Sequence, residues 1–218
     1  MTQPLTGIIT NGNACLHWLA GAAPNLEKAR AATERIIRDG NRASEVINGI
    51  RALVKKTPPH EDPMDVNDLI RKTITLTAGE MSRNHVELDT ELAVELPFVV
   101  ADPVLLQQVL LNLIMNAIEA MSSVNDRPRK LTILSQRLEA PSAVQVIVRD
   151  NGIGLDAVNS DRVFDPFYTS KPQGMGMGLS ICRTIIAAHG GQLTATANTG
   201  HGASFQFLLP AGAEARRE

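Results

Sequence analysis

Three glycines at alternate positions, Gly174, Gly176 and Gly178, stand directly before an apolar stretch that is typical of a helix. The N–H groups at a helix N-terminus have no partner inside the helix, and the helix dipole adds positive potential, so this segment suits a phosphate. A dinucleotide-binding fold would need a buried strand before the glycines and an acidic residue about 20 positions later, and neither is present. The Gly-Lys-Ser/Thr of a P-loop is also absent. The glycines therefore predict a phosphate cradle of another kind.

Two amides on one predicted helix could serve the same ligand. Asn112 and Asn116 are four positions apart and so share a helix face, with Glu119 further along. An amide is costly to bury unless its polar atoms are used, and its carbonyl oxygen can ligate a hard cation such as Mg²⁺ that bridges phosphates. Amides that cap neighbouring loops would give the same pattern.

A carboxylate stands at the end of an apolar run, residues 144–148. Asp150 could there accept a hydrogen bond from an exocyclic amine such as that of adenine. Gly152 and Gly154 would let the backbone approach a flat ring closely. Alone, Asp-Asn-Gly is also an ordinary turn.

The elements that must position these residues fall into two parts. Residues 26–56 contain no proline and carry an apolar seam in steps of four and three, and residues 5–19 repeat the pattern, which favours a helical hairpin. The hairpin either forms a four-helix bundle with a second copy or packs onto its own C-terminal domain. We expect a hairpin dimerisation domain over 1–57 and a second domain over 63–212. The seam of the longer helix is Ala29, Thr33, Ile36, Gly40, Ala43, Ile47, Ile50 and Val54.

The second domain mixes helices and strands without a regular βαβ period. Helices are expected over 67–81, with Asn67 as its cap, over 103–121, with Pro103 in the first turn, and over 179–189. Strands are expected over 86–92, 98–102, 130–137, 143–151, 192–198 and 203–210. This order predicts an α+β sandwich in which helices cover one face of a mixed sheet.

Charge and composition narrow the classes of function. A formal net charge of −2 and a pI near 6.2 provide no basic field for nucleic acid. No apolar run is expected to cross a membrane, which leaves a membrane link of a longer protein open. Cys15 and Cys182 are expected to be free thiols, which fits a reducing cytoplasm.

Four short motifs resemble, in order and spacing, the N, first glycine, phenylalanine and second glycine boxes of bacterial sensor histidine kinases. They read NLIMNA at 112–117, DNGIG at 150–154, FDPF at 164–167 and GMGMGL at 174–179. The resemblance implies the ATP-binding sandwich that these kinases share with gyrase, the heat-shock chaperone ATPases and the mismatch-repair ATPases. It makes the glycine segment a mobile lid over the triphosphate of ATP.

The resemblance also implies roles for single residues. Asn116 matches the Mg²⁺ ligand, Asn112 lies near the phosphates, and Asp150 matches the carboxylate that reads adenine. Lys171 stands where related kinases place a basic residue that can reach the γ-phosphate. Ser204 stands where the superfamily has a hydroxyl that helps Asp150 to hold adenine. The hinges of the lid and its phosphate-facing turns match Gly152, Gly154, Gly174, Gly176 and Gly178. Leu179, which ends the second glycine motif, is also expected at the nucleotide site.

One departure concerns the N box, where many of these kinases carry Lys or Arg. Met115 and Glu119 occupy that part of the helix here. The negative charge of the phosphates would therefore be neutralised mainly by Mg²⁺, Lys171 and the backbone of the lid.

The implied function is the kinase module of a two-component system. Such a kinase moves the γ-phosphoryl of ATP to a histidine and then to an aspartate of a response-regulator receiver domain, and it dimerises, here through residues 1–56. Gln3, Pro4 and Leu5 resemble the end of the H box, so the phosphoacceptor histidine is expected two positions before Met1. This chain would then hold no catalytic residue and would not autophosphorylate alone. The alternatives are an ATP-binding pseudokinase or histidine-phosphotransfer docking module, and an anti-sigma kinase, against which the long hairpin argues.

Overall fold

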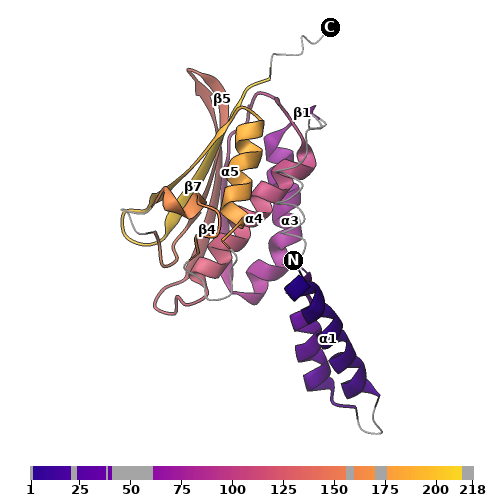
Figure 1. The fold of residues 1–218 in the computed structure, drawn as a ribbon. Coiled ribbons are helices and arrows are strands. Elements are labelled where there is room, and N and C mark those ends of the chain that lie inside the picture. Colours follow the sequence, from indigo (N-terminus) through magenta and orange to yellow (C-terminus); the bar gives the residue numbers. More distant parts are fainter. Residues whose placement is uncertain are drawn as a thin grey trace. The chain divides into compact units, whose positions relative to one another are not determined.

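The computed structural model describes residues 2–20, 24–37, 39–40, 61–155, 160–169 and 176–212. The chain divides into two units, Met1–Lys55 and Lys56–Glu218 (Figure 1). The second half of the predicted seam, with Ala43, Ile47, Ile50 and Val54, lies outside the described residues.

The first unit is a helical hairpin, as its apolar seam predicts. Helix α1 spans Thr2–Leu19, and residues 26–37 form the helix that returns. Ala29 and Ala32 are buried, and the Cys15 thiol lies 3.6 Å from the carbonyl oxygen of Ala29. Ala32, which the predicted seam does not include, is thus buried together with the seam residue Ala29.

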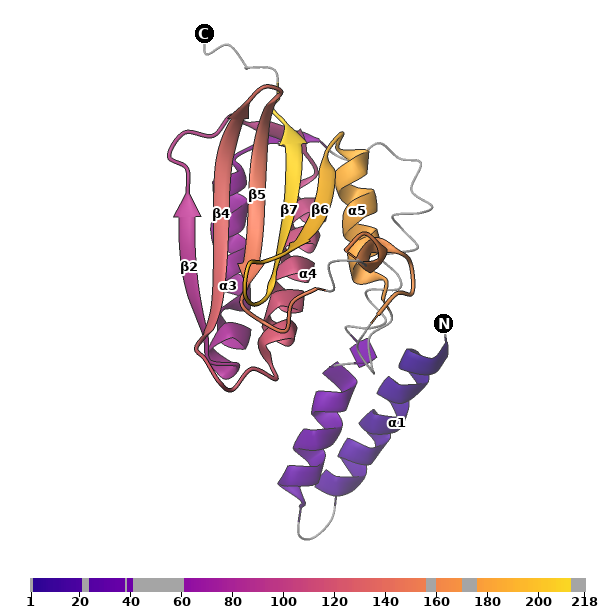
Figure 2. The same ribbon diagram turned by 90° about the vertical axis from the view of Figure 1, so that its left-hand side faces the viewer.

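The second unit contains a mixed five-stranded sheet in the order β2-β4-β5-β7-β6 (Figure 2). Strands β2 and β4 are parallel, and the other neighbours are antiparallel. The predicted α+β class is confirmed. The strands are β2 Val86–Leu92, β4 Arg129–Glu139, β5 Ser142–Asp150, β6 Gln192–Ala197 and β7 Ala203–Pro210.

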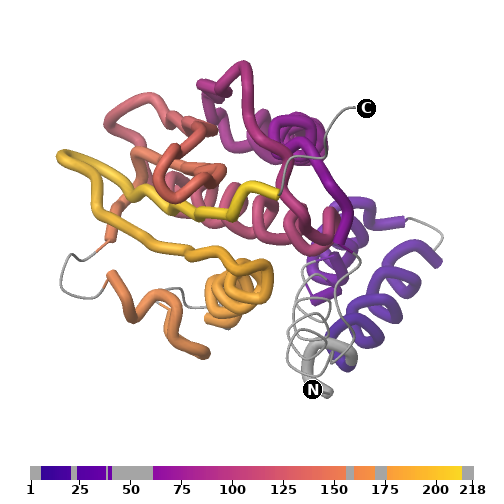
Figure 3. The backbone as a smooth tube through the Cα atoms, turned by 90° about the horizontal axis from the view of Figure 1, so that it is seen from above, coloured from indigo at the N-terminus to yellow at the C-terminus, as the bar shows by residue number. Residues whose placement is uncertain are grey.

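Three helices cover one face of this sheet, as the view from above shows (Figure 3). They are α3 Val66–Arg83, α4 Pro103–Met121 and α5 Gly178–Ala188. Side chains alternate across each strand, so one set meets the helices and the other stays open. The buried set on the central strands is Leu131, Ile133, Val144, Val146, Val148, Phe205, Phe207 and Leu209.

The starts of α3 and α4 are set by aspartates. Asp102 Oδ1 accepts hydrogen bonds from the N–H groups of Val104 and Leu105 at 2.9 and 3.2 Å, and Pro103 occupies the first turn as expected. Such a cap contributes about 1 kcal/mol to helix stability. The expected cap of α3 is wrong. Asp65 is the cap, and the buried Asn67 side chain instead donates to the carbonyl oxygen of Ala93.

The predicted strand over 98–102 exists as β3, Val99–Ala101, but it does not join the main sheet. It pairs antiparallel with β1, Asp62–Met64, which the sequence did not predict. Three residues beside prolines carry too little periodic pattern to indicate a strand.

His189 ends α5 and joins it to the start of α4. Its Nε2 accepts a hydrogen bond from the N–H of Asp102 at 3.0 Å, so Nδ1 carries the ring proton and donates to the carbonyl oxygen of Ile185 at 2.8 Å. The imidazole thus serves a last-turn carbonyl, as expected for a polar residue before a Gly-Gly stop.

Among the described residues, α4 is the one helix long and apolar enough to cross a membrane. This differs from the expectation that no apolar run has that length. Its buried residues pack in the core with α3, α5 and the sheet, as the central helix of a globular domain does.

Candidate functional site

Asp150 is a buried carboxyl group at the end of the central strand β5. Only 2% of the residue is exposed, and its side chain lies on the helix-covered face of the sheet. Oδ1 accepts hydrogen bonds from the N–H of Gly152 at 2.8 Å and the N–H of Ala203 at 3.4 Å. Burial raises the pKa of Asp150 above its ordinary value, and these N–H donors lower it by less. No described residue donates a hydrogen bond to Oδ2, so this oxygen can accept a bond from a ligand amine.

Gly152 and Gly154 form the turn that follows Asp150, and at Gly152 the packing of the turn against α4 itself requires glycine. A Cβ on Gly152 would lie 2.6 Å from the carbonyl oxygen of Ala120 in α4. The same carbonyl accepts the N–H of Ile153 at 3.1 Å. Glycine is therefore required at position 152 because the turn lies against the end of α4. The expected close approach to a flat ring stays a prediction.

The Asn112 amide of α4 contacts α5. Asn112 is half-buried, and its Nδ2 donates to the Cys182 thiol at 3.5 Å. Burial raises the pKa of that thiol to about 12, so it stays neutral and can accept this bond. A Cβ built on Gly178 would lie 4.0 Å from the same Nδ2. Asn116 is half-buried one turn further along the same face.

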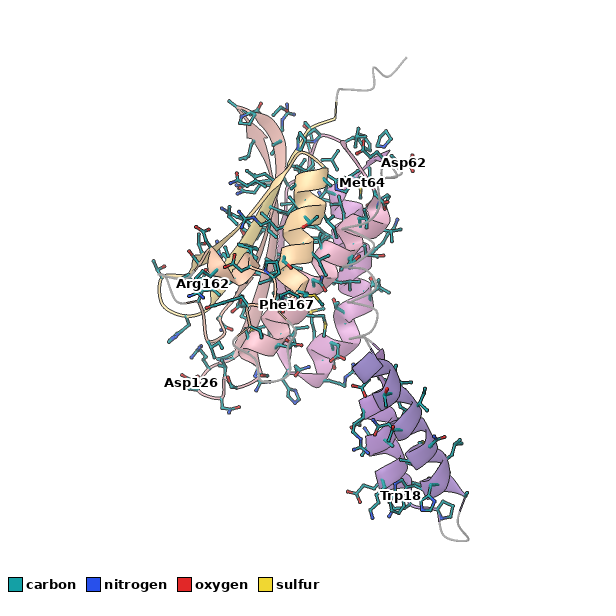
Figure 4. The ribbon with its side chains drawn as sticks, viewed as in Figure 1. Trp18, Asp62, Met64, Asp126, Arg162 and Phe167 are labelled. Carbon is teal, nitrogen blue, oxygen red and sulfur yellow. The ribbon has the colours of Figure 1, made fainter. Side chains whose placement is uncertain are left out.

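The phenylalanine and second glycine motifs are joined by their backbones. The N–H of Phe167 donates to the carbonyl oxygen of Gly176 at 3.0 Å. Gly176 has a φ of 65°, and a Cβ there would lie 2.4 Å from the carbonyl oxygen of Tyr168, so no other residue fits. Phe164 is buried, whereas Phe167, which Figure 4 labels, is 74% exposed.

The glycine segment before α5 is described only in part. Gly178 begins α5, and Leu179 packs against the core. Lys171 and Gly174 lie outside the described residues, so their expected contacts with phosphate stay predictions.

The expected role of Ser204 is wrong. Ser204 pairs with Arg149 in the β5–β7 ladder and shares its open face, opposite the Asp150 side chain. Its hydroxyl donates to Asn198 Oδ1 at 2.7 Å and accepts from Arg149 Nε at 3.2 Å. Ala203, one residue earlier, lies on the face of Asp150 and supplies only its N–H. The alternation of Phe205 and Phe207 could have revealed this, because period two places Ala203 with them.

Residues 101–213 match the family of histidine kinase-, DNA gyrase B- and HSP90-like ATPases. The chain belongs to this family. It carries the ATP-binding catalytic domain of a sensor histidine kinase, and its homologues are ATP-dependent protein kinases.

Known sensor kinases are similar over nearly the whole chain. Sensor histidine kinase TmoS of Ectopseudomonas mendocina is 36% identical over 210 residues, which cover 96% of this chain and 22% of TmoS. The catalytic domain of histidine kinase ThkA is 34% identical with a TM-score of 0.61, covering 69% of this chain and 95% of the solved one. ThkA in complex with the response regulator TrrA is 26% identical with a TM-score of 0.67, and the match covers 98% of this chain and 60% of the ThkA chain. The chain spans less than half the length of the curated relatives it matches.

Proposed function

We propose that residues 63–212 bind Mg²⁺-ATP and deliver its γ-phosphoryl group to a histidine, from which it passes to an aspartate of a response-regulator receiver domain. The observation that carries this proposal is the buried Asp150 carboxyl, 2% exposed, held by the N–H of Gly152. Such a carboxylate is suited to one exocyclic amine, and the family binds ATP.

The polar groups support one orientation of the nucleotide. Adenine would lie with its amine on Asp150, and the phosphates would extend toward Asn112 and Gly178, where α5 begins and its free N–H groups favour anions. Lys171, Gly174 and Gly176 would complete the phosphate contacts. Asn116 offers the amide oxygen that a hard cation accepts. Mg²⁺ would neutralise phosphate charge during transfer.

The hairpin supports dimerisation as the second part of the proposal. It exposes large apolar side chains on both helices: Ile9 by 65%, Leu16 by 67%, Leu26 by 70% and Ile37 by 56%. Two helices cannot bury these side chains on their own, so a second hairpin would cover them in a four-helix bundle. We therefore propose a homodimer through residues 1–56.

The response regulator is proposed as the protein partner because a similar kinase, ThkA, is solved in complex with the response regulator TrrA. The two cysteines are free thiols, and both ATP and reduced thiols are found in the cytoplasm, where we place this domain.

The nucleotide site can be tested through Asn116, the proposed Mg²⁺ ligand. Asn116→Ala is expected to weaken ATP binding in isothermal titration when Mg²⁺ is present and to change it little when a chelator is in excess, because only the cation contact is lost. Gln108→Ala, on the same helix, is the control. Equal weakening with and without Mg²⁺ would remove Asn116 as the metal ligand, and no binding of ATP by the unmutated chain would refute the proposed function.

A further inference from the structure

The turn after β5 and the segment before β4 each donate hydrogen bonds to the other. Arg127 donates from Nε and Nη2 to the carbonyl oxygen of Asn151 at 3.1 and 3.0 Å, and from Nη2 to that of Gly152 at 3.1 Å. Asn151 returns these contacts. Its Nδ2 donates to the carbonyl oxygen of Pro128 at 2.7 Å, and its Oδ1 accepts the N–H of Lys130 at 2.9 Å. The two segments therefore hold each other in register.

The first carbonyl that Arg127 binds shares a peptide plane with the donor to Asp150. The carbonyl of Asn151 and the N–H of Gly152 form one rigid planar unit. That N–H donates to Asp150 Oδ1 at 2.8 Å. A guanidinium on the carbonyl side thus orients the N–H on the other side, and a charge-assisted bond to the carbonyl also polarises the N–H as a donor.

The next peptide plane is held in the same way. The carbonyl of Gly152 accepts from Arg127, and the N–H of Ile153 donates to Ala120 at the end of α4. Glycine restricts its backbone less than any other residue, so both planes around Gly152 need external contacts to keep one orientation.

The Arg127 side chain is itself held in place by burial and by an ion pair with Asp126. Its side chain is only 22% exposed, and Nη1 donates to both oxygens of Asp126 at 2.9 Å. Asp126, which Figure 4 labels, is 72% exposed, so this ion pair adds little stability and mainly directs the guanidinium. Lysine could not bind two carbonyls and a carboxylate at once in this fork geometry.

We infer that Arg127 is a positioning residue for base recognition: it holds the Asn151–Gly152 peptide so that the Asp150 carboxylate faces the exocyclic amine of adenine. This inference rests on the ATP site proposed above. Arg127 touches neither the nucleotide nor the reacting atoms. It acts through the turn.

The test compares two triphosphates on the full 218-residue chain. Inosine triphosphate carries a carbonyl where ATP carries the exocyclic amine, so the ratio of the two dissociation constants reports the contact of Asp150 with that amine. Arg127→Gln is expected to reduce the preference for ATP about tenfold, the lower end of the change expected when the adenine amine loses its charge-assisted hydrogen bond to Asp150. Arg127→Lys is expected to retain part of the preference, because it can still bind one carbonyl.

Arg129 provides the matched control. It also donates to backbone carbonyls, those of Val124, Asn84 and Ser122, but to none in the turn. Arg129→Gln is expected to lower the melting temperature and to keep the preference for ATP, so a merely structural effect is separated from a positioning effect.

The outcomes are distinguishable. If the unmutated chain prefers ATP and Asp150→Asn abolishes that preference, the proposed site stands. An unchanged preference in Arg127→Gln would then overturn this inference alone. Should Arg127→Gln fail to fold, a full preference in Arg127→Lys overturns it equally. A chain without any preference for ATP over inosine triphosphate would overturn the inference together with the proposed adenine contact.

Discussion

Replacement of Asp150 by asparagine separates nucleotide binding from stability. Oδ1 of Asp150 already accepts from Gly152 and Ala203, at 2.8 and 3.4 Å. In Asp150→Asn the amide oxygen must remain there, because an amide nitrogen cannot accept these bonds. The amide NH₂ then takes the place of Oδ2 and faces the adenine amine donor to donor.

The loss can be sized from the bond that disappears. A hydrogen bond to a charged group contributes about 1.5 to 3 kcal/mol, so the dissociation constants of ATP and ADP are expected to rise about 10- to 150-fold. Isothermal titration at neutral pH measures both. Asp89→Asn removes the same charge from the open face, where Asp89 pairs with Lys130 at 3.3 Å, and is expected to bind ATP normally.

The same substitution is expected to leave the free protein as stable or to stabilise it. Burial raises the pKa of Asp150 above 3.8, so as the pH rises the unfolded chain loses this proton before the folded chain does. The carboxyl therefore costs stability as the pH rises from 3.8 through the folded pKa, and the cost persists at neutral pH. Asparagine carries no charge, so the melting temperature at pH 7 should equal or exceed that of the unmutated chain. ATP affinity should fall as the pH drops through the raised pKa of Asp150, because protonation removes the charged acceptor for the adenine amine. Unchanged ATP affinity in a well-folded Asp150→Asn would refute the adenine contact.

The remaining predictions concern the turn and the hairpin. Gly152→Ala would place a Cβ 2.6 Å from the carbonyl oxygen of Ala120, so thermal unfolding is expected to show a loss of about 1 to 3 kcal/mol. Gly79→Ala, on the exposed side of α3, is its control and should stabilise the helix by about 0.5 to 1 kcal/mol. Leu16→Glu is expected to yield monomers in light scattering, because Leu16 is 67% exposed on the hairpin. A monomer for the unmutated chain at micromolar concentration would contradict the proposed dimer.

The local sequence pattern was sufficient to predict features that depend on a single helix or strand. The alternation in residues 86–92 predicted β2 with its observed bounds, and Pro103 marked the first turn of α4. Spacing also placed Asn112 and Asn116 on one helix face, because the helical period depends on the backbone alone. The fold class and the order of the motifs could likewise be read from the chain.

Contacts between distant segments needed the tertiary structure. The alternation of Phe205 and Phe207 groups Ala203 with the buried side of β7, but only the pairing of β5 with β7 brings Ala203 to Asp150, which lies 53 residues away along the chain. The chain alone likewise could not reveal that β1 would pair with β3, that Gly152 would lie against Ala120, or that Arg127 would bind the turn after β5. Sequence thus determined which residues could recognise a nucleotide, and packing decided which of them lie together, because strand register and the close approach of backbones arise only when the whole core forms.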